Sequence, residues 1–131
     1  MSLATIPTSH TDLLLEPLPV TLATVGPTGY PQLTAIWAVL DGDVIVTSLA
    51  GIRQKLKNLT ARPQATLFVI DPANSYRTLE LRCDVSIEPD PELATLVKVL
   101  SAYGTDLASF EAPLEGRVTV MLRPVHVVAQ G

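Results

Sequence analysis

The sequence predicts a mainly β protein, an antiparallel barrel of Greek-key type with six or seven strands and two or three short helices. Short β-branched and apolar runs recur along most of the chain. Glycine, proline and aspartate separate these runs, and helical spacing of apolar residues is confined to a few short stretches. A sheet of many short strands removes its exposed edges by closing on itself, so a barrel is the expected architecture.

Turn residues mark the boundaries of the expected strands. Asp41-Gly42 between two apolar runs is a strong hairpin signal, and Gly26-Pro27-Thr28-Gly29 separates the first two runs. Pro124 is expected to break the last strand, because proline cannot donate a ladder hydrogen bond. The expected strands are Val20–Val25, Gln32–Leu40, Val44–Leu49, Ala65–Ile70, Thr78–Ile87 and Arg117–Leu122, with a resumption in Val125–Val128.

Two of the expected helices begin at capping residues. Ser9 is expected to cap a short helix that ends at Pro17. Asp90 is expected to cap a second helix with Pro91 in its first position. Apolar residues then repeat at helical spacing until Gly104, namely Leu93, Leu96, Val97 and Leu100.

The composition indicates one domain that associates with another subunit. A chain of 131 residues can bury one core, so we expect a single domain over residues 1–131. Hydrophobic residues make up 47% and charged residues only 17% of the sequence, and the mean hydropathy is +0.34. Apolar surface in excess of one core is best covered by a partner, so we expect a homodimer.

Several functional classes are disfavoured by charge and by the rarer residues. The net charge of −4 argues against a nucleic-acid partner, which would need a basic surface. No apolar run is long enough for a membrane span, and the first residues do not resemble a signal peptide, so a cytoplasmic location is expected. The single Cys83 excludes an internal disulfide and alternates with core residues. His10 and His126 lack ligand spacing, so no metal site is expected.

The most informative stretch is Val44 to Leu59, VIVTSLAGIRQKLKNL. A strand there passes through small and hydroxyl residues into an amphipathic helix that carries Arg53, Lys55 and Lys57. Backbone N–H groups at a helix start, hydroxyl donors and cationic side chains together bind phosphate monoesters well. A solvated basic helix face is the alternative interpretation of the same residues.

The ordered segments LATV, PTGYPQLTAIWAVLDGDVIVTS, ARPQATLFVIDP and YRTLELRCDV resemble the pyridoxamine 5′-phosphate oxidase-like family of FMN-binding split β-barrels. The resemblance covers about Pro19 to Val128 and is closest to the small members that depend on a flavin or on the deazaflavin coenzyme F-420. It implies a split β-barrel fold, a homodimer and a bound FMN, with F-420 as the alternative cofactor.

The resemblance also implies which residues bind the cofactor. Arg53 and Lys55 match the family's basic pair at the helix start. The full set of implied cofactor-binding residues is Gln32, Thr34, Trp37, Thr47, Ser48, Arg53, Lys55, Tyr76 and Arg77. Trp37 matches an aromatic beside the isoalloxazine edge, Gln32 and Thr34 are placed to hydrogen-bond the ring system, and Tyr76-Arg77 matches a segment that reaches the partner's cofactor.

Alternatives remain for some of these residues. Trp37 is equally compatible with a core or interface anchor, and Thr47 with an ordinary β-branched strand residue. Lys57 and Asn58 are expected to face solvent or the next loop. Relatives often carry glycine directly before the first helix arginine, whereas Ile52 takes that place here and Gly51 lies one residue earlier. A member that has lost its flavin, or one that holds a different phosphorylated ligand, would carry such a change.

The sequence singles out no catalytic residue. It shows no Ser-His-Asp set, carboxylate pair or Cys-His pair, so a redox cofactor would supply the chemistry. We therefore expect an oxidoreductase that moves hydride to or from a small conjugated substrate. The alternative is a dimeric protein of the same fold that binds a flavin or heme without turnover. The family's vitamin B6 oxidase activity is less favoured, since no arginine-rich C-terminal segment is present.

Overall fold

The computed structural model describes residues 3–131 and contains seven strands in one antiparallel sheet, in the order β2-β1-β5-β6-β7-β4-β3. The strands are β1 (Val20–Val25), β2 (Pro31–Ile36), β3 (Val39–Asp41), β4 (Val44–Leu49), β5 (Gln64–Asp71), β6 (Asn74–Pro89) and β7 (Val118–Gln130). The helices are α1 (Asp12–Leu15), α2 (Gln54–Ala61), α3 (Ala94–Ala102) and the 3-10 turn η1 (Leu107–Ser109). The predicted mainly β, antiparallel fold with short helices is confirmed.

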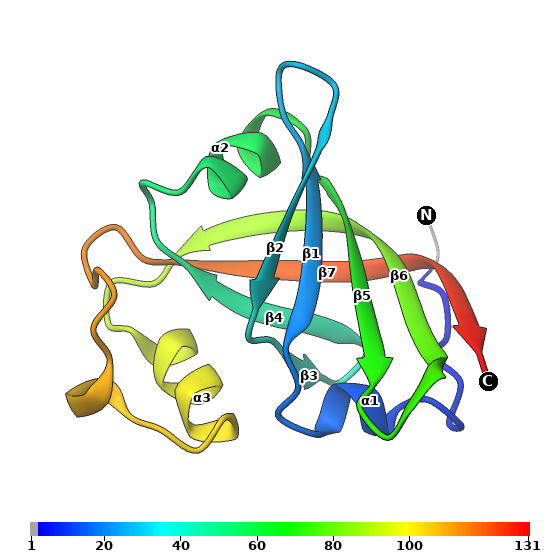
Figure 1. Ribbon diagram of the computed structural model, residues 1–131. Coiled ribbons are helices and arrows are strands. Elements are labelled where there is room, and N and C mark those ends of the chain that lie inside the picture. The colour runs from blue at the N-terminus through cyan, green and yellow to red at the C-terminus, as the bar shows by residue number, and fades with distance from the viewer. Residues whose placement is uncertain (1–2) are drawn as a thin grey trace.

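The connection between β2 and β3 shows why the sheet must curl. These two strands form opposite edges of the strand order, yet only Trp37 and Ala38 separate them in the sequence. The three Cα–Cα steps from Ile36 to Val39 span at most about 11 Å, so the two edges of the sheet must approach each other. The sheet therefore wraps into a split barrel (Figure 1), and Thr47 of β4 contacts Trp37 directly after β2.

The predicted strand Gln32–Leu40 is wrong in its continuity, because it is divided into β2 and β3. Ile36 and Ala38 are buried while Trp37 between them is exposed, so the alternating pattern continues through the break. The Trp37 carbonyl oxygen instead accepts a hydrogen bond from Thr47 Oγ1 at 2.6 Å. The Thr47 hydroxyl thus takes the place of a backbone N–H from a neighbouring strand, at the point where the chain passes from one edge of the sheet to the other.

The predicted break at Pro124 is also wrong, because β7 runs through this residue. The register against β6 shifts between Arg82 and Cys83, which face His126 and Pro124, and this leaves one extra residue on β7. Such a bulge lets proline sit in a strand without a missing ladder bond. The Pro124 carbonyl oxygen accepts a hydrogen bond from Ala4 N at 2.8 Å.

Two predicted helix starts are displaced. α3 begins at Ala94 rather than at Pro91, and Leu93 before it has a left-handed backbone with φ of 64°. Asp90 still caps the helix from outside, since its carboxylate accepts from Thr95 N at 3.1 Å and Leu96 N at 3.3 Å. α1 is preceded by Thr11, and the Ser9 hydroxyl bonds the His10 ring instead of capping.

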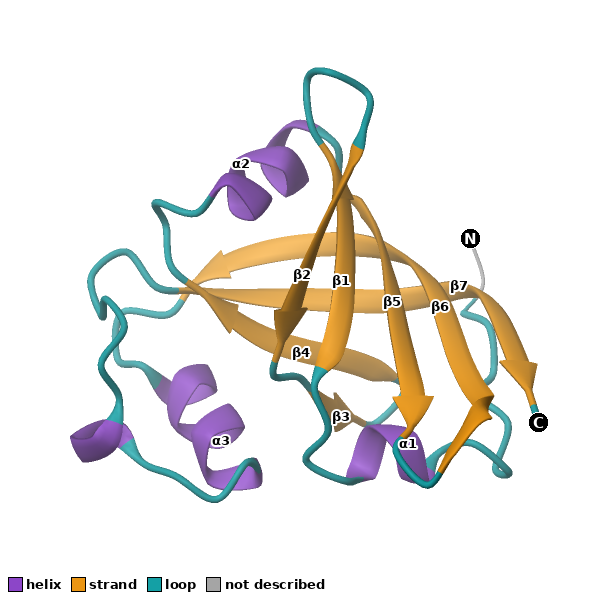
Figure 2. Cartoon of the chain, in the orientation of Figure 1, coloured by secondary structure: helices purple, strands orange, loops and turns teal. Residues whose placement is uncertain are grey.

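The helices lie around the barrel rather than inside it. α2 packs beside β1, α3 beside β4, and α1 against β3 and β5 (Figure 2). The barrel interior is filled by aliphatic side chains such as Leu22, Ile45, Leu67, Leu81 and Leu122, each 1% exposed or less. Within residues 3–131, no helix is long and apolar enough to cross a membrane.

Candidate functional site: a cationic cleft beside the barrel

A cleft of about 340 Å³ lies where the end of β4, the start of α2, helix α3 and the residues before β7 come together. Its polar lining comprises Thr47, Ser48, Arg53, Lys55 and Arg117. The remaining lining is mostly apolar, from Pro19, Ala35, Ile36, Trp37, Leu49, Ala50, Leu96, Val99, Leu100, Phe110 and Ala112. The cleft therefore combines a cationic part with an apolar part.

A close backbone contact shapes the cationic part. A Cβ on Gly51 would lie 2.9 Å from the Gly116 carbonyl oxygen, so only glycine allows the β4–α2 turn to approach the start of β7. The glycine requirement at this turn thus falls on Gly51. Ile52 is 71% exposed beside it. The contact brings Arg117, which follows Gly116, next to the end of β4.

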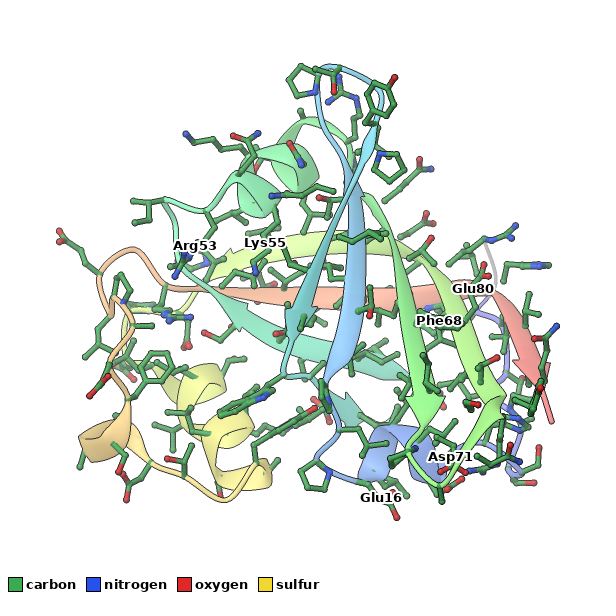
Figure 3. The ribbon with its side chains drawn as sticks, viewed as in Figure 1. Glu16, Arg53, Lys55, Phe68, Asp71 and Glu80 are labelled. Atoms are coloured by element: carbon green, nitrogen blue, oxygen red, sulfur yellow. The ribbon has the colours of Figure 1, made fainter. Side chains whose placement is uncertain are left out.

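Three cations meet in the cleft without a carboxylate partner. Arg53, Lys55 and Arg117 all line it. The ion pairs of the described residues involve other cations, namely Arg77, Arg82 and Lys98. Figure 3 shows Arg53 and Lys55 close together at the start of α2. An unpaired cluster of like charges favours binding of an anion.

Arg117 is the most buried of the three cations, with 8% of its surface exposed. Its Nε donates to the Pro113 carbonyl oxygen at 2.8 Å. One terminal nitrogen lies 3.4 Å from both the carbonyl oxygen and the hydroxyl of Ser48. The guanidinium carbon lies 4.9 Å from the centroid of the Phe110 ring, within cation–π range. All of these partners are neutral, so the positive charge remains uncompensated.

The electrostatics reflect this lack of counter-charge. Burial lowers the pKa of Lys55 below its ordinary value, and the charges of Arg53 and Arg117 lower it further. Burial and the neighbouring Arg53 likewise lower the pKa of Arg117. An anion in the cleft would oppose both effects, because an opposite charge favours the protonated form of each group.

Trp37 in the apolar lining of the cleft is stacked on Tyr103, which is not itself part of the lining. The Trp37 and Tyr103 rings are stacked, with centroids 4.8 Å apart and an interplanar angle of 12°. The Tyr103 hydroxyl accepts from Ala38 N at 3.2 Å and donates to the Leu18 carbonyl oxygen at 2.7 Å. Tyr103 thereby fixes the β2–β3 break and the orientation of Trp37, which remains 43% exposed.

The structure brings five of the predicted site residues to the cleft, namely Trp37, Thr47, Ser48, Arg53 and Lys55. Thr47 is 1% exposed and its hydroxyl hydrogen is donated to the Trp37 carbonyl oxygen. Ser48 is half-buried, and its hydroxyl lies 3.4 Å from a terminal nitrogen of Arg117. Of the two hydroxyls, Ser48 is therefore the better placed to donate to a ligand.

Gln32 and Thr34 lie next to the cleft, under α2. Thr34 Oγ1 accepts from Lys55 Nζ at 3.4 Å. Gln32 Oε1 accepts from Asn58 Nδ2 at 3.2 Å, and the same nitrogen donates to Thr24 Oγ1 at 3.0 Å. Asn58 is only 3% exposed, so the expectation that it faces solvent or a loop is wrong. This polar network holds α2 on the β1–β2 hairpin.

Tyr76 and Arg77 lie far from the cleft of their own chain. They belong to the β5–β6 hairpin, at the end of the barrel marked by Asp71 in Figure 3. Arg77 forms ion pairs with Asp12 and Asp71 and donates to the Ser9 carbonyl oxygen, while Tyr76 is 86% exposed. Contact with the cofactor of a partner subunit stays a prediction.

The sequence reading missed Arg117, Phe110 and Tyr103. The sequence indicates only that Arg117 begins a strand, whereas its place in the cleft depends on the pairing of β4 with β7, where Ser48 faces Thr119. A single signal was available, an arginine at the start of an otherwise apolar strand. In residues 3–131, no cluster of three His, Cys, Asp or Glu side chains could hold a metal ion.

Comparison with known families decides the classification. The family model described as pyridoxamine 5′-phosphate oxidase matches residues 6–130. The chain belongs to this family. Members share the split barrel described above, and the resemblance drawn from the sequence is confirmed. A search of curated proteins finds no match.

Solved structures of the same fold include proteins with different names. An F420 reductase is 39% identical, with a TM-score of 0.85 over 94% of this chain and 98% of its own. A conserved hypothetical protein from Mycobacterium tuberculosis is 21% identical, with a TM-score of 0.78 over 98% and 86% of the two chains. HutZ, the heme storage protein from Vibrio cholerae, is 20% identical, with a TM-score of 0.69 over 98% and 96%. The last two likenesses show the fold alone.

Proposed function

We propose that this protein is an oxidoreductase which binds FMN or the deazaflavin F-420 in the cationic cleft and acts on a small conjugated substrate. This proposal rests on three cations without ion-pair partners, Arg53, Lys55 and Arg117, at one end of an otherwise apolar cleft. A phosphorylated ring system matches this division, with the phosphate at the cations and the ring toward the apolar lining. The 39% identical F420 reductase supports a cofactor of this type.

Different residues of the cleft would contact different parts of the cofactor. Arg53 and Lys55 would neutralise the phosphate, the Ser48 hydroxyl would donate to it, and Arg117 would add a buried charge. Trp37 and the leucines of α3 would cover the apolar portion and exclude water. When bound, the flavin or deazaflavin would supply hydride transfer, and the protein would hold and shield it.

The proposed function also includes a dimer with a second copy of the chain. The outward face of the β1–β2 hairpin is apolar, with Val25, Tyr30 and Leu33 exposed, and Trp37 directly after β2 is exposed as well. We propose that a two-fold dimer covers this face and brings Tyr76 and Arg77 of one subunit near the cofactor of the other. Such an interface would bury on the order of 2,000 Å². A sedimenting species of 14.0 kDa at micromolar concentration would contradict it.

Heme binding has less support in the geometry. HutZ is described as a heme storage protein, but neither histidine of this chain lines the cleft. His10 is buried, with both ring nitrogens hydrogen-bonded to Ser9 and Gln130. Titration with heme tests this alternative, and a Soret band that depends on His126 would favour it over the flavin proposal.

The test of the cofactor proposal is binding of FMN, F-420 and riboflavin, followed by fluorescence and absorbance. Riboflavin has the flavin ring without the phosphate, so it is the matched control. We expect FMN or F-420 to bind at least about tenfold more tightly than riboflavin, the effect of about 1.4 kcal/mol from the phosphate contacts. The bound cofactor should be reduced and reoxidised by small electron donors and acceptors. Binding of none of the three, or binding of both FMN and F-420 no tighter than that of riboflavin, would contradict the proposal. A cytoplasmic location is part of it, and cell fractionation tests that part.

A further inference from the structure

The residues between α3 and β7 form one wall of the cleft but are weakly attached to the barrel. Residues 105–116 contain only the 3-10 turn η1, and most of them are exposed. The Asp106 carboxylate caps this turn internally through Ser109 N at 3.0 Å. Phe110 and Ala112 of this stretch line the cleft. The wall therefore depends on few contacts for its position.

Besides the backbone contact of Gly116 with Gly51, Arg117 makes the main attachment of this wall. In the described part of the chain, the hydrogen bond that joins residues 106–116 to other residues runs from Arg117 Nε to the Pro113 carbonyl oxygen. The same guanidinium packs over the Phe110 ring. Its terminal nitrogen reaches Ser48 at the end of β4. One side chain thus links the wall to the cationic part of the cleft.

The charge on Arg117 makes this link sensitive to occupancy of the cleft. Without an anion, a buried guanidinium lies beside two other cations and has only neutral partners. Burial of an unpaired charge is unfavourable, so arrangements that release Arg117 to solvent compete with the closed one. A phosphate between Arg53, Lys55 and Arg117 would supply the missing counter-charge and favour the closed arrangement.

We propose that Arg117 is a positioning residue that couples phosphate binding at the cationic part of the cleft to ordering of residues 105–116 over its apolar part. The inference rests on the proposed function in taking the phosphate of the cofactor as the natural anion. Its consequence is that the phosphate end of a ligand places Phe110 against the remainder of that ligand. The two parts of the cleft would then act as one site, because a linkage between binding and ordering works in both directions.

Hydrogen exchange tests the coupling with inorganic phosphate as the probe. Amides of residues 105–116 are compared with those of the β5–β6 hairpin around Tyr76, with chloride at equal ionic strength as the control. At a phosphate concentration about ten times its dissociation constant, exchange in residues 105–116 should slow by about tenfold, while the hairpin is unchanged. Absence of this protection, or equal protection of the hairpin, would overturn the proposal.

Two conservative variants separate coupling from general stability. Arg117→Lys keeps the charge but loses the Nε donor and the planar group over Phe110. Phe110→Leu keeps all three cations and removes the aromatic ring. Both should still broaden the ³¹P signal of phosphate, yet the protection should fall to about twofold or less. Protection equal to that of the parent in Arg117→Lys would overturn the proposal. If phosphate protects the segment while FMN and F-420 fail to bind, the coupling stands and the cofactor proposal fails.

Discussion

Replacement of Arg53 by alanine tests the phosphate site through a residue that contributes little to the fold. A lost hydrogen bond to a charged group costs about 1.5–3 kcal/mol, which corresponds to a loss of FMN affinity of about tenfold to 150-fold. The Arg53 side chain is exposed, and Lys55 and Arg117 remain in the variant, so the lower part of this range is expected. Fluorescence titration of the purified variant with FMN measures the change.

The stability of the cofactor-free protein should be nearly unaffected. Arg53 occupies the N-cap position of α2, but its side chain makes no capping hydrogen bond. The free energy of unfolding should therefore change by less than about 0.5 kcal/mol. Lys57→Ala is the matched control, because Lys57 carries the same charge on the same helix but is exposed and does not line the cleft.

The Arg53→Ala substitution should also change the pKa of Lys55, which can be measured by NMR. The charge of Arg53 is one of the causes that lower the pKa of Lys55, so Arg53→Ala should raise that pKa. An NMR titration of the lysine side chain detects the shift. If Arg53→Ala binds FMN as the parent does, or if Lys57→Ala weakens binding to the same extent, the assignment of the phosphate site is wrong.

Three further predictions concern pH, salt and the thiol. FMN affinity should fall as the pH rises toward 10.5, because the pKa of Lys55 in the free protein is lowered and the side chain loses its charge below pH 10.5. Lys55→Arg should remove this fall, because arginine stays charged in this range. The affinity for F-420 should decrease with added salt more steeply than the affinity for FMN, because the acidic tail of F-420 extends to exposed cations. Lys57→Glu should lower the affinity for F-420, and titrations of both cofactors at two salt concentrations measure these effects. Burial raises the pKa of Cys83 to about 12, so folded protein at pH 8 should resist a thiol reagent. Between pH about 9 and 12 the unfolded chain releases the thiol proton first, so unfolding should become easier in this range, and Cys83→Ala should remove this dependence.

Local signals predicted the elements that depend on neighbouring residues. The Asp41-Gly42 hairpin is present, with Asp41 facing Val44 and Gly42 at a φ of 62°. Cys83 is a core thiol, as its alternation with core residues predicts. In each case the deciding interaction lies within a few residues or follows from strand alternation, which the sequence displays directly.

Features that depend on closure of the barrel were not predictable. The division between β2 and β3 occurs because Trp37 and Ala38 join the two edges of the sheet, while the alternation of apolar residues continues unchanged. Arg117 reaches the cleft because β7 pairs with β4, which lies about seventy positions earlier in the chain. Gly51, just after β4, also contacts Gly116, just before Arg117. Local sequence does not encode such a long-range approach of two backbones.

A crystal structure of the protein with FMN or F-420 bound would locate the phosphate directly. We expect the phosphate within hydrogen-bonding distance of Arg53, Lys55 and the Ser48 hydroxyl, with Arg117 as the buried counter-charge. We also expect the ring to lie toward Trp37 and the apolar lining of the cleft. A phosphate bound elsewhere, for example beside Arg82 on the outer face of the barrel, would contradict this expectation.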